Sequence, residues 1–94
     1  MIRHICMFTL KEDKKNIAKF FEKAEKPREL DIIKKFNIVR NVGGTPLSNY
    51  DVALIFDFES IDTLDEYQKS PQHLEFGEFV YSVRESRACI DYEL

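Results

Sequence analysis

Tyr67 and His73 lie on either side of Ser70-Pro71, which interrupts the helical pattern of the sequence. A neutral histidine is a competent general base near neutral pH, because its reference pKa is about 6.5. A tyrosine hydroxyl can donate a hydrogen bond to a carbonyl and stabilise an enolate or oxyanion. The pair therefore predicts proton abstraction next to a carbonyl group, if both side chains reach one pocket. His4 is a third candidate, which would orient His73 or contact the substrate.

A purely structural interpretation accounts for the same residues. Tyr67 has the spacing of a core aromatic that shares a helix face with Ile61 and Leu64. A buried tyrosine usually finds a hydrogen-bond partner whether or not it is catalytic. His73 would then only cover the start of a helix, and His4 would be a satisfied strand histidine. Both interpretations of the three candidates stay open at this point.

The hydrophobic pattern predicts a ferredoxin-like domain that occupies residues 1–94. Ser60 is a good helix N-cap, and Ser70 followed by proline is a fresh helix start. Pro27 is expected to end or kink the first helix at Lys26. The order is β-α-β-β-α-β, which is typical of a four-stranded antiparallel sheet with its helices on one face. The expected strands are 2–10, 36–44, 50–58 and 87–94, and the expected helices are 12–25, 60–70 and 71–85.

The first and third strands are apolar on both faces, which is unusual for an antiparallel sheet with one solvated side. Ile5, Met7, Ala53 and Ile55 alternate with the residues that face the helices. The helices can cover only one side, and monomers usually avoid leaving a large apolar patch in water. We expect a homodimer in which two sheets pack face to face. A ligand or another protein on that face is the alternative.

Composition excludes several function classes. The net charge of −3 with no basic stripe argues against nucleic acid as a partner. No apolar run approaches the roughly 20 residues that span a bilayer, and no signal peptide is expected. Cys6 and Cys89 are expected to be buried free thiols in a reducing cytosol, which predicts a cytoplasmic protein. Asp91 is expected to pair with Arg84 or Arg87.

No metal or cofactor is expected. His4, His73 and Cys6 do not have the close spacing of metal ligands. A pocket histidine would be compatible with haem, but nothing in the sequence selects it. The remaining partner would be a small apolar or carbonyl-containing molecule.

Four segments together carry a resemblance to a known family. They are "MIRHICMFTLKE", "YDVALIFDFES", "YQKSPQHLEFGEFV" and "CIDYEL". The chain resembles the stress-responsive dimeric α/β barrel family nearly from end to end. The resemblance implies a ferredoxin-like subunit, a dimer whose two sheets form a barrel, and an association with stress responses.

The resemblance also implies a chemistry. A plant polyketide cyclase of this family performs an intramolecular aldol condensation, and its catalytic tyrosine and histidine match Tyr67 and His73, while its first-strand histidine matches His4. The cyclase has further histidines where this chain has Val52 and Ser70, so the polar lining here is thinner. The implied function is a small-molecule-binding protein with cyclase- or lyase-like chemistry, in which His73 is the base and Tyr67 the hydrogen-bond donor. The alternative is a non-catalytic stress-related dimer or ligand carrier.

Overall fold

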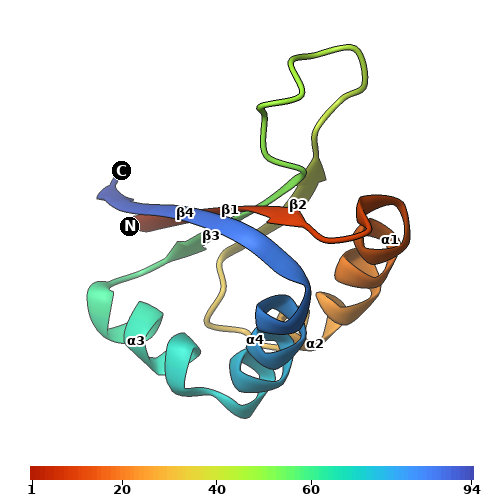
Figure 1. Cartoon of the computed structure of the whole chain (residues 1–94). Coiled ribbons are helices and arrows are strands. Elements are labelled where there is room, and N and C mark those ends of the chain that lie inside the picture. The colour runs from red at the N-terminus through yellow and green to blue at the C-terminus, as the bar shows by residue number, and fades with distance from the viewer.

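The sheet has four strands in the order β2-β3-β1-β4, and all neighbouring strands are antiparallel. This is the ferredoxin-like arrangement expected from the sequence. The computed structural model describes residues 1–94, and Figure 1 shows the helices gathered on one side of the sheet. The strands are β1 (Ile2–Leu10), β2 (Lys35–Arg40), β3 (Val52–Phe58) and β4 (Arg84–Glu93). The helices are α1 (Asp13–Lys23), α2 (Glu25–Arg28), α3 (Ile61–Lys69) and α4 (Pro71–Val83).

Strand β1 is central, and its alternate residues face opposite sides of the sheet. Its even-numbered residues are all buried beneath the helices, whereas its odd-numbered residues are half-buried. On the helix side, His4 lies opposite Phe56 of β3 and Asp91 of β4, and Cys6 lies opposite Leu54 and Cys89. The register therefore places polar and sulfur-bearing side chains of β1 and β4 under the helical layer.

Each crossover between strands contains two helical segments rather than one. The expected single helix over 12–25 is wrong at its end, because α1 stops at Lys23 and α2 begins at Glu25. The sequence suggested that Pro27 ends or kinks the first helix. Instead, Pro27 lies buried in the first turn of α2. The first-turn backbone N–H groups have no partner within a helix, so a proline is tolerated there.

Helix α3 begins where the sequence predicts it. The Ser60 hydroxyl accepts a hydrogen bond from the Thr63 amide, and the Thr63 hydroxyl accepts one from the Ser60 amide. The expectation that Ile61 shares the core face with Tyr67 is wrong, since Ile61 is exposed. At about 100° per residue the two side chains point about 120° apart, whereas Leu64 stays buried beside Tyr67.

The core lies between the sheet and the helices and is rich in aromatic residues. Phe20 of α1 packs edge-on against Phe76 of α4, with ring centroids 5.3 Å apart. Tyr67 of α3 lies against Phe56 and Phe58 of β3, at 5.7 and 5.2 Å. These contacts fix α3 and α4 on the sheet and determine where the side chains of the break between them point.

The opposite side of the sheet carries no helix (Figure 1). The strand register places seven apolar residues there, which we call the open face. Ile5 lies between Ile55 and Ile90, and the neighbouring row follows the same register. Val39 and Ile90 are exposed, and the other members are half-buried. The open face consists of Ile5, Met7, Val39, Ala53, Ile55, Ala88 and Ile90.

None of the helices has the length and apolar character that crossing a membrane would require.

Candidate functional site

A cavity of about 250 Å³ lies between the sheet and the segments α3 and α4. All three candidate residues from the sequence line it, together with Cys6 from β1 and two arginines from β4. The structure therefore brings Tyr67, His73 and His4 to one site. The lining residues are His4, Cys6, Phe8, Leu54, Tyr67, Gln68, His73, Phe76, Gly77, Val80, Tyr81, Arg84 and Arg87.

The Tyr67 side chain is buried, yet its hydroxyl forms no hydrogen bond with any group of the chain. Only 1% of the residue is exposed, and its ring is held by the aromatic residues of β3. Burial raises the pKa of Tyr67 well above its usual range, so the hydroxyl stays protonated at neutral pH. A rigid, unpaired O–H at a cavity wall is a suitable donor to a ligand oxygen.

The two candidate residues are joined through Ser70. The Ser70 hydroxyl donates to the Tyr67 carbonyl at 2.7 Å and accepts from the His73 amide at 3.1 Å. Ser70 is thus both the C-cap of α3 and the N-cap of α4. This arrangement turns the chain so that the His73 ring lies 4.7 Å from the Tyr67 ring, in an edge-on contact.

Replacing this cap tests its contribution. Ser70→Ala removes the acceptor for the His73 amide and is expected to lower the free energy of unfolding by about 1 kcal/mol, a typical N-cap loss. Ser82→Ala is the matched control, because the Ser82 hydroxyl only donates to the Phe79 carbonyl on an exposed helix face. Urea denaturation of both variants measures the difference. Equal stability of the two variants would contradict the capping role.

His73 has a defined tautomer. Its Nδ1 lies 2.9 Å from the Gln68 carbonyl oxygen, which can only accept, so Nδ1 carries the proton. In the neutral ring the other nitrogen, Nε2, then has a free lone pair, and no group of the chain is hydrogen-bonded to it. Burial is the main cause that lowers the pKa of His73 below 6.5; the hydrogen bond to Gln68 opposes it, and smaller electrostatic effects of His4 and Arg87 add to the lowering. His73 is therefore neutral at pH 7 and has the form of a general base.

The lowered pKa of His73 gives a pH dependence. The unfolded chain binds the proton more readily than the folded one, so stability from this group is present above pH 6.5 and is lost as the pH falls through the folded-state pKa. An NMR titration of the His73 ring should have its midpoint below 6.5. The loss of stability on acidification should be smaller in His73→Gln. A midpoint at or above 6.5 would contradict the assignment.

His4 lies at the same cavity but is not hydrogen-bonded to His73. Its Nδ1 lies 2.5 Å from Oδ1 of Asp91, and its Nε2 lies 3.5 Å from Sγ of Cys6. The expected pairing of Asp91 with Arg84 or Arg87 is wrong, because the register sets Asp91 directly opposite His4 on the same face of the sheet. Nδ1 of His4 donates its hydrogen to the Asp91 carboxylate, so the lone pair of the neutral ring is on Nε2.

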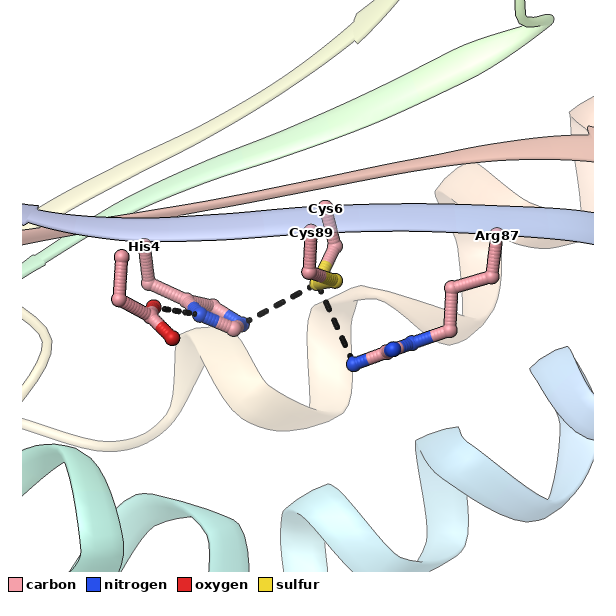
Figure 2. Close-up of a disulfide and its surroundings, with 5 residues drawn as sticks. His4, Cys6, Arg87 and Cys89 are labelled. Atoms are coloured by element: carbon pink, nitrogen blue, oxygen red, sulfur yellow. Dashed lines mark hydrogen bonds and ion pairs between the residues drawn. A yellow bond between two sulfur atoms is a disulfide. The ribbon is translucent and has the colours of Figure 1, made fainter.

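Cys6 and Cys89 form a disulfide between β1 and β4, so the expectation of two free thiols is wrong. Figure 2 shows the bridge on the helix side of the sheet, with His4 on one side and Arg87 on the other. The cysteines are 83 positions apart in the chain but directly opposite each other in the antiparallel register. Sequence spacing alone carries no signal for such a cross-strand pair.

Two cationic side chains line the cavity although the chain is acidic overall. The side chains of Arg84 and Arg87 line it, and none of its 13 lining residues is Asp or Glu. The Arg84 guanidinium lies over the Tyr81 ring, 5.2 Å from its centroid. The sequence predicts for these two arginines only an ion pair with Asp91, and no place at the cavity. An unpaired arginine at a cavity is suited to bind an anionic group of a ligand.

The fold and the cavity together define a ferredoxin-like α+β domain with a small cavity between its sheet and its helices. The chain belongs to the stress responsive A/B barrel domain family, whose sequence model matches residues 2–94. A comparison with curated protein sequences finds no match.

Several solved structures share this fold. A dimeric protein of unknown function with a ferredoxin-like fold from Bacteroides fragilis has 29% identity and a TM-score of 0.81, over 99% of this chain and 95% of that one. A family member from Mesorhizobium loti has 24% identity and a TM-score of 0.80, over 99% and 95%. The hydroxynitrile lyase from Passiflora edulis has 18% identity and a TM-score of 0.84, over 99% and 92%.

Proposed function

We propose that this protein is a homodimeric enzyme that binds a small carbonyl-containing molecule and acts on it by general-base chemistry. One observation carries the proposal: at the same cavity wall, the Tyr67 hydroxyl and the His73 Nε2 are both without a partner in the chain, and their rings are 4.7 Å apart. Neither of these two atoms is enclosed by the chain, so both are open to the cavity, and an unpaired donor beside an unpaired acceptor is suited to a ligand.

The roles follow from the protonation states of the two side chains, because His73 has a free lone pair on Nε2 and Tyr67 keeps its O–H. His73 Nε2 takes a proton from a carbon next to the substrate carbonyl, or from a substrate hydroxyl, and the Gln68 carbonyl holds the resulting imidazolium through Nδ1. Tyr67 donates a hydrogen bond to the carbonyl oxygen as negative charge develops there. Aldol condensation begins with removal of a proton from a carbon next to a carbonyl, and the cleavage of a hydroxynitrile begins with removal of a hydroxyl proton. The second reaction is the activity of the Passiflora relative.

The two arginines narrow the substrate class. A carboxylate or another anionic group on the substrate would bind Arg84, while the apolar residues Leu54, Phe76 and Val80 would contact its hydrocarbon part. The volume of about 250 Å³ limits the substrate to a small molecule. The proposed substrate is therefore a small, partly apolar carbonyl compound that carries a negative charge.

The dimer is inferred from the open face. Its seven apolar residues lie on the side of the sheet that no helix covers, and a second copy would bury them. The relatives from Bacteroides fragilis and Thermobifida fusca, which share this fold, are described as dimeric. Apolar burial at about 25 cal/mol per Å² is the expected source of the association energy.

The test is turnover of defined probes. Small keto acids in D₂O report proton abstraction through the exchange of α-protons for deuterium, followed by NMR, and small hydroxynitriles report cleavage through release of the aldehyde or ketone. Wild type should accelerate at least one of these reactions, and Glu29→Gln, a variant of an exposed residue that does not line the cavity, should do so equally. Saturable binding of the keto acids with no turnover of any probe would support a ligand carrier instead of an enzyme.

A further inference from the structure

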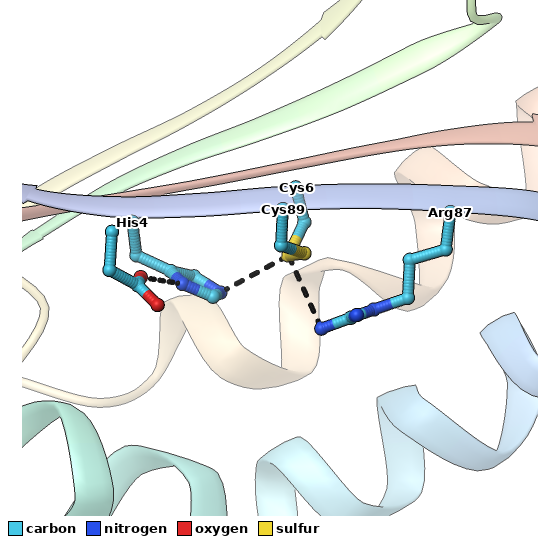
Figure 3. Close-up of polar contacts among 5 residues, drawn as sticks. His4, Cys6, Arg87 and Cys89 are labelled. Atoms are coloured by element: carbon cyan, nitrogen blue, oxygen red, sulfur yellow. Dashed lines mark hydrogen bonds and ion pairs between the residues drawn. A yellow bond between two sulfur atoms is a disulfide. The ribbon is translucent and has the colours of Figure 1, made fainter.

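We infer that the Cys6–Cys89 disulfide is a reversible redox site that exchanges with small-molecule thiols, with His4 as the proton acceptor for Cys6. The inference does not depend on the proposed carbonyl chemistry. It rests on the groups around one of the two sulfur atoms, which Figure 3 shows as a connected row of contacts from His4 through Cys6 to Arg87.

The surroundings of the two sulfurs are unequal. Sγ of Cys6 lies 3.5 Å from Nε2 of His4 and 3.9 Å from an Nη atom of Arg87. Asp91 holds the opposite nitrogen of His4, so the lone pair on Nε2 faces Cys6. When Cys6 is reduced, its S–H is within reach of that lone pair. The transfer of its proton yields a thiolate between an imidazolium and a guanidinium, the setting that favours the ionised form of cysteine.

This asymmetry assigns a direction to the exchange. Cys6 is buried at 3% exposure, whereas Cys89 is half-buried and easier to reach. The thiolate of an external thiol attacks Sγ of Cys89, a mixed disulfide forms there, and the S–S bond breaks with both electrons leaving on Cys6. A second external thiol then attacks the external sulfur of the mixed disulfide. That step releases the Cys89 thiolate and an external disulfide.

The external thiol alone supplies the electrons and protons that reduce the bridge. Two thiols supply two electrons and two protons, and the products are two protein thiols and one small-molecule disulfide. The reverse reaction consumes that disulfide and restores the bridge. The leaving sulfur is the one beside the Arg87 guanidinium, which stabilises the departing thiolate, and a stabilised leaving thiolate speeds exchange. A bridge with a purely structural role would need no proton acceptor and no cation at one of its sulfurs.

The first test measures reversibility with glutathione as the probe. The folded protein is equilibrated in buffers with different ratios of reduced to oxidised glutathione. The exchange is quenched with acid, free thiols are alkylated, and mass spectrometry measures the fractions of the bridged and dithiol forms. We expect full and reversible interconversion of the bridged and dithiol forms without denaturant, with the far-ultraviolet circular dichroism unchanged. A bridge that resists every ratio, or a dithiol form that unfolds, would overturn the inference and leave a structural disulfide.

The second test isolates the role of His4. In the Cys89→Ser variant only the Cys6 thiol remains, and its rate of alkylation by iodoacetamide is followed against pH. The midpoint should lie below the free-cysteine value of about 8.5, and adding His4→Gln should raise it and slow alkylation at neutral pH about tenfold or more. Arg87→Gln should have a smaller effect in the same direction. Arg40→Gln, which removes the same charge at an exposed position, should leave the profile unchanged.

Identical profiles with and without His4 would overturn the assignment of His4 as the proton acceptor. The result is distinguishable from a failure of the carbonyl chemistry, because alkylation reports the thiol and needs no substrate.

Discussion

Ile5→Glu is expected to convert the proposed dimer, with twice the 11.1 kDa mass of the chain, into a folded monomer. Ile5 is at the middle of the open face, between Ile55 and Ile90. A carboxylate at this position would be buried without a partner in the dimer. Because the dimer is twofold symmetric, each subunit would bring one such carboxylate into the interface. An uncompensated buried charge costs about 3–5 kcal/mol, so association should weaken at least about 100-fold.

The monomer should keep its fold, because the core lies on the other side of the sheet and is untouched by this change. Ile61→Glu is the matched control, since it makes the same substitution at an exposed residue of α3. Sedimentation equilibrium and circular dichroism measure the mass and the fold of both variants. A wild-type chain that sediments as a stable monomer at micromolar concentration would refute the dimer, and so would an Ile5→Glu variant that still dimerises like the control.

His73→Gln is expected to lower kcat/KM by about 10²–10⁴-fold on whichever probe the wild type turns over, because it removes a general base. Glutamine can still donate to the Gln68 carbonyl, so the start of α4 should keep its geometry. Ligand binding should change far less than turnover. A loss of binding with unchanged kcat would show that His73 positions the substrate instead of taking its proton.

The wild-type pH profile gives an independent check of His73. A base works only when it is unprotonated, and burial lowers the pKa of His73, so the rate should fall on the acid side with a midpoint below 6.5 and should be level through neutral pH. Tyr67→Phe should lower kcat without moving that midpoint upward. A profile with its acid limb above pH 7 would point to a different base.

Strand periodicity was sufficient to predict the fold and the two-faced character of β1 and β3. Alternation also placed His4 and Cys6 on one shared face of the first strand, and the Ser70-Pro71 signal located the turn that brings Tyr67 to His73. These features depend on residues close together in sequence, where local stereochemistry decides the outcome.

The features that sequence could not supply depend on register and on side-chain partners. Cys6 meets Cys89, and His4 meets Asp91, only because β1 and β4 pair in one of several possible alignments. The pairing of Nδ1 of His73 with a carbonyl, which fixes its tautomer, depends on the angle between α3 and α4. The exposure of Ile61, in contrast, follows from helical geometry alone, because three apolar residues at three-residue spacing drift around the helix.

The alternation along β1 gives one nine-residue segment two separate tasks. Its even positions supply the imidazole and the sulfur of the cavity, and its odd positions supply the apolar centre of the surface assigned to a twin subunit. Deleting or inserting a single residue within this segment would exchange the two sets and destroy both surfaces at once. Substitutions in β1 are therefore expected to be tolerated only when they respect the parity of the position.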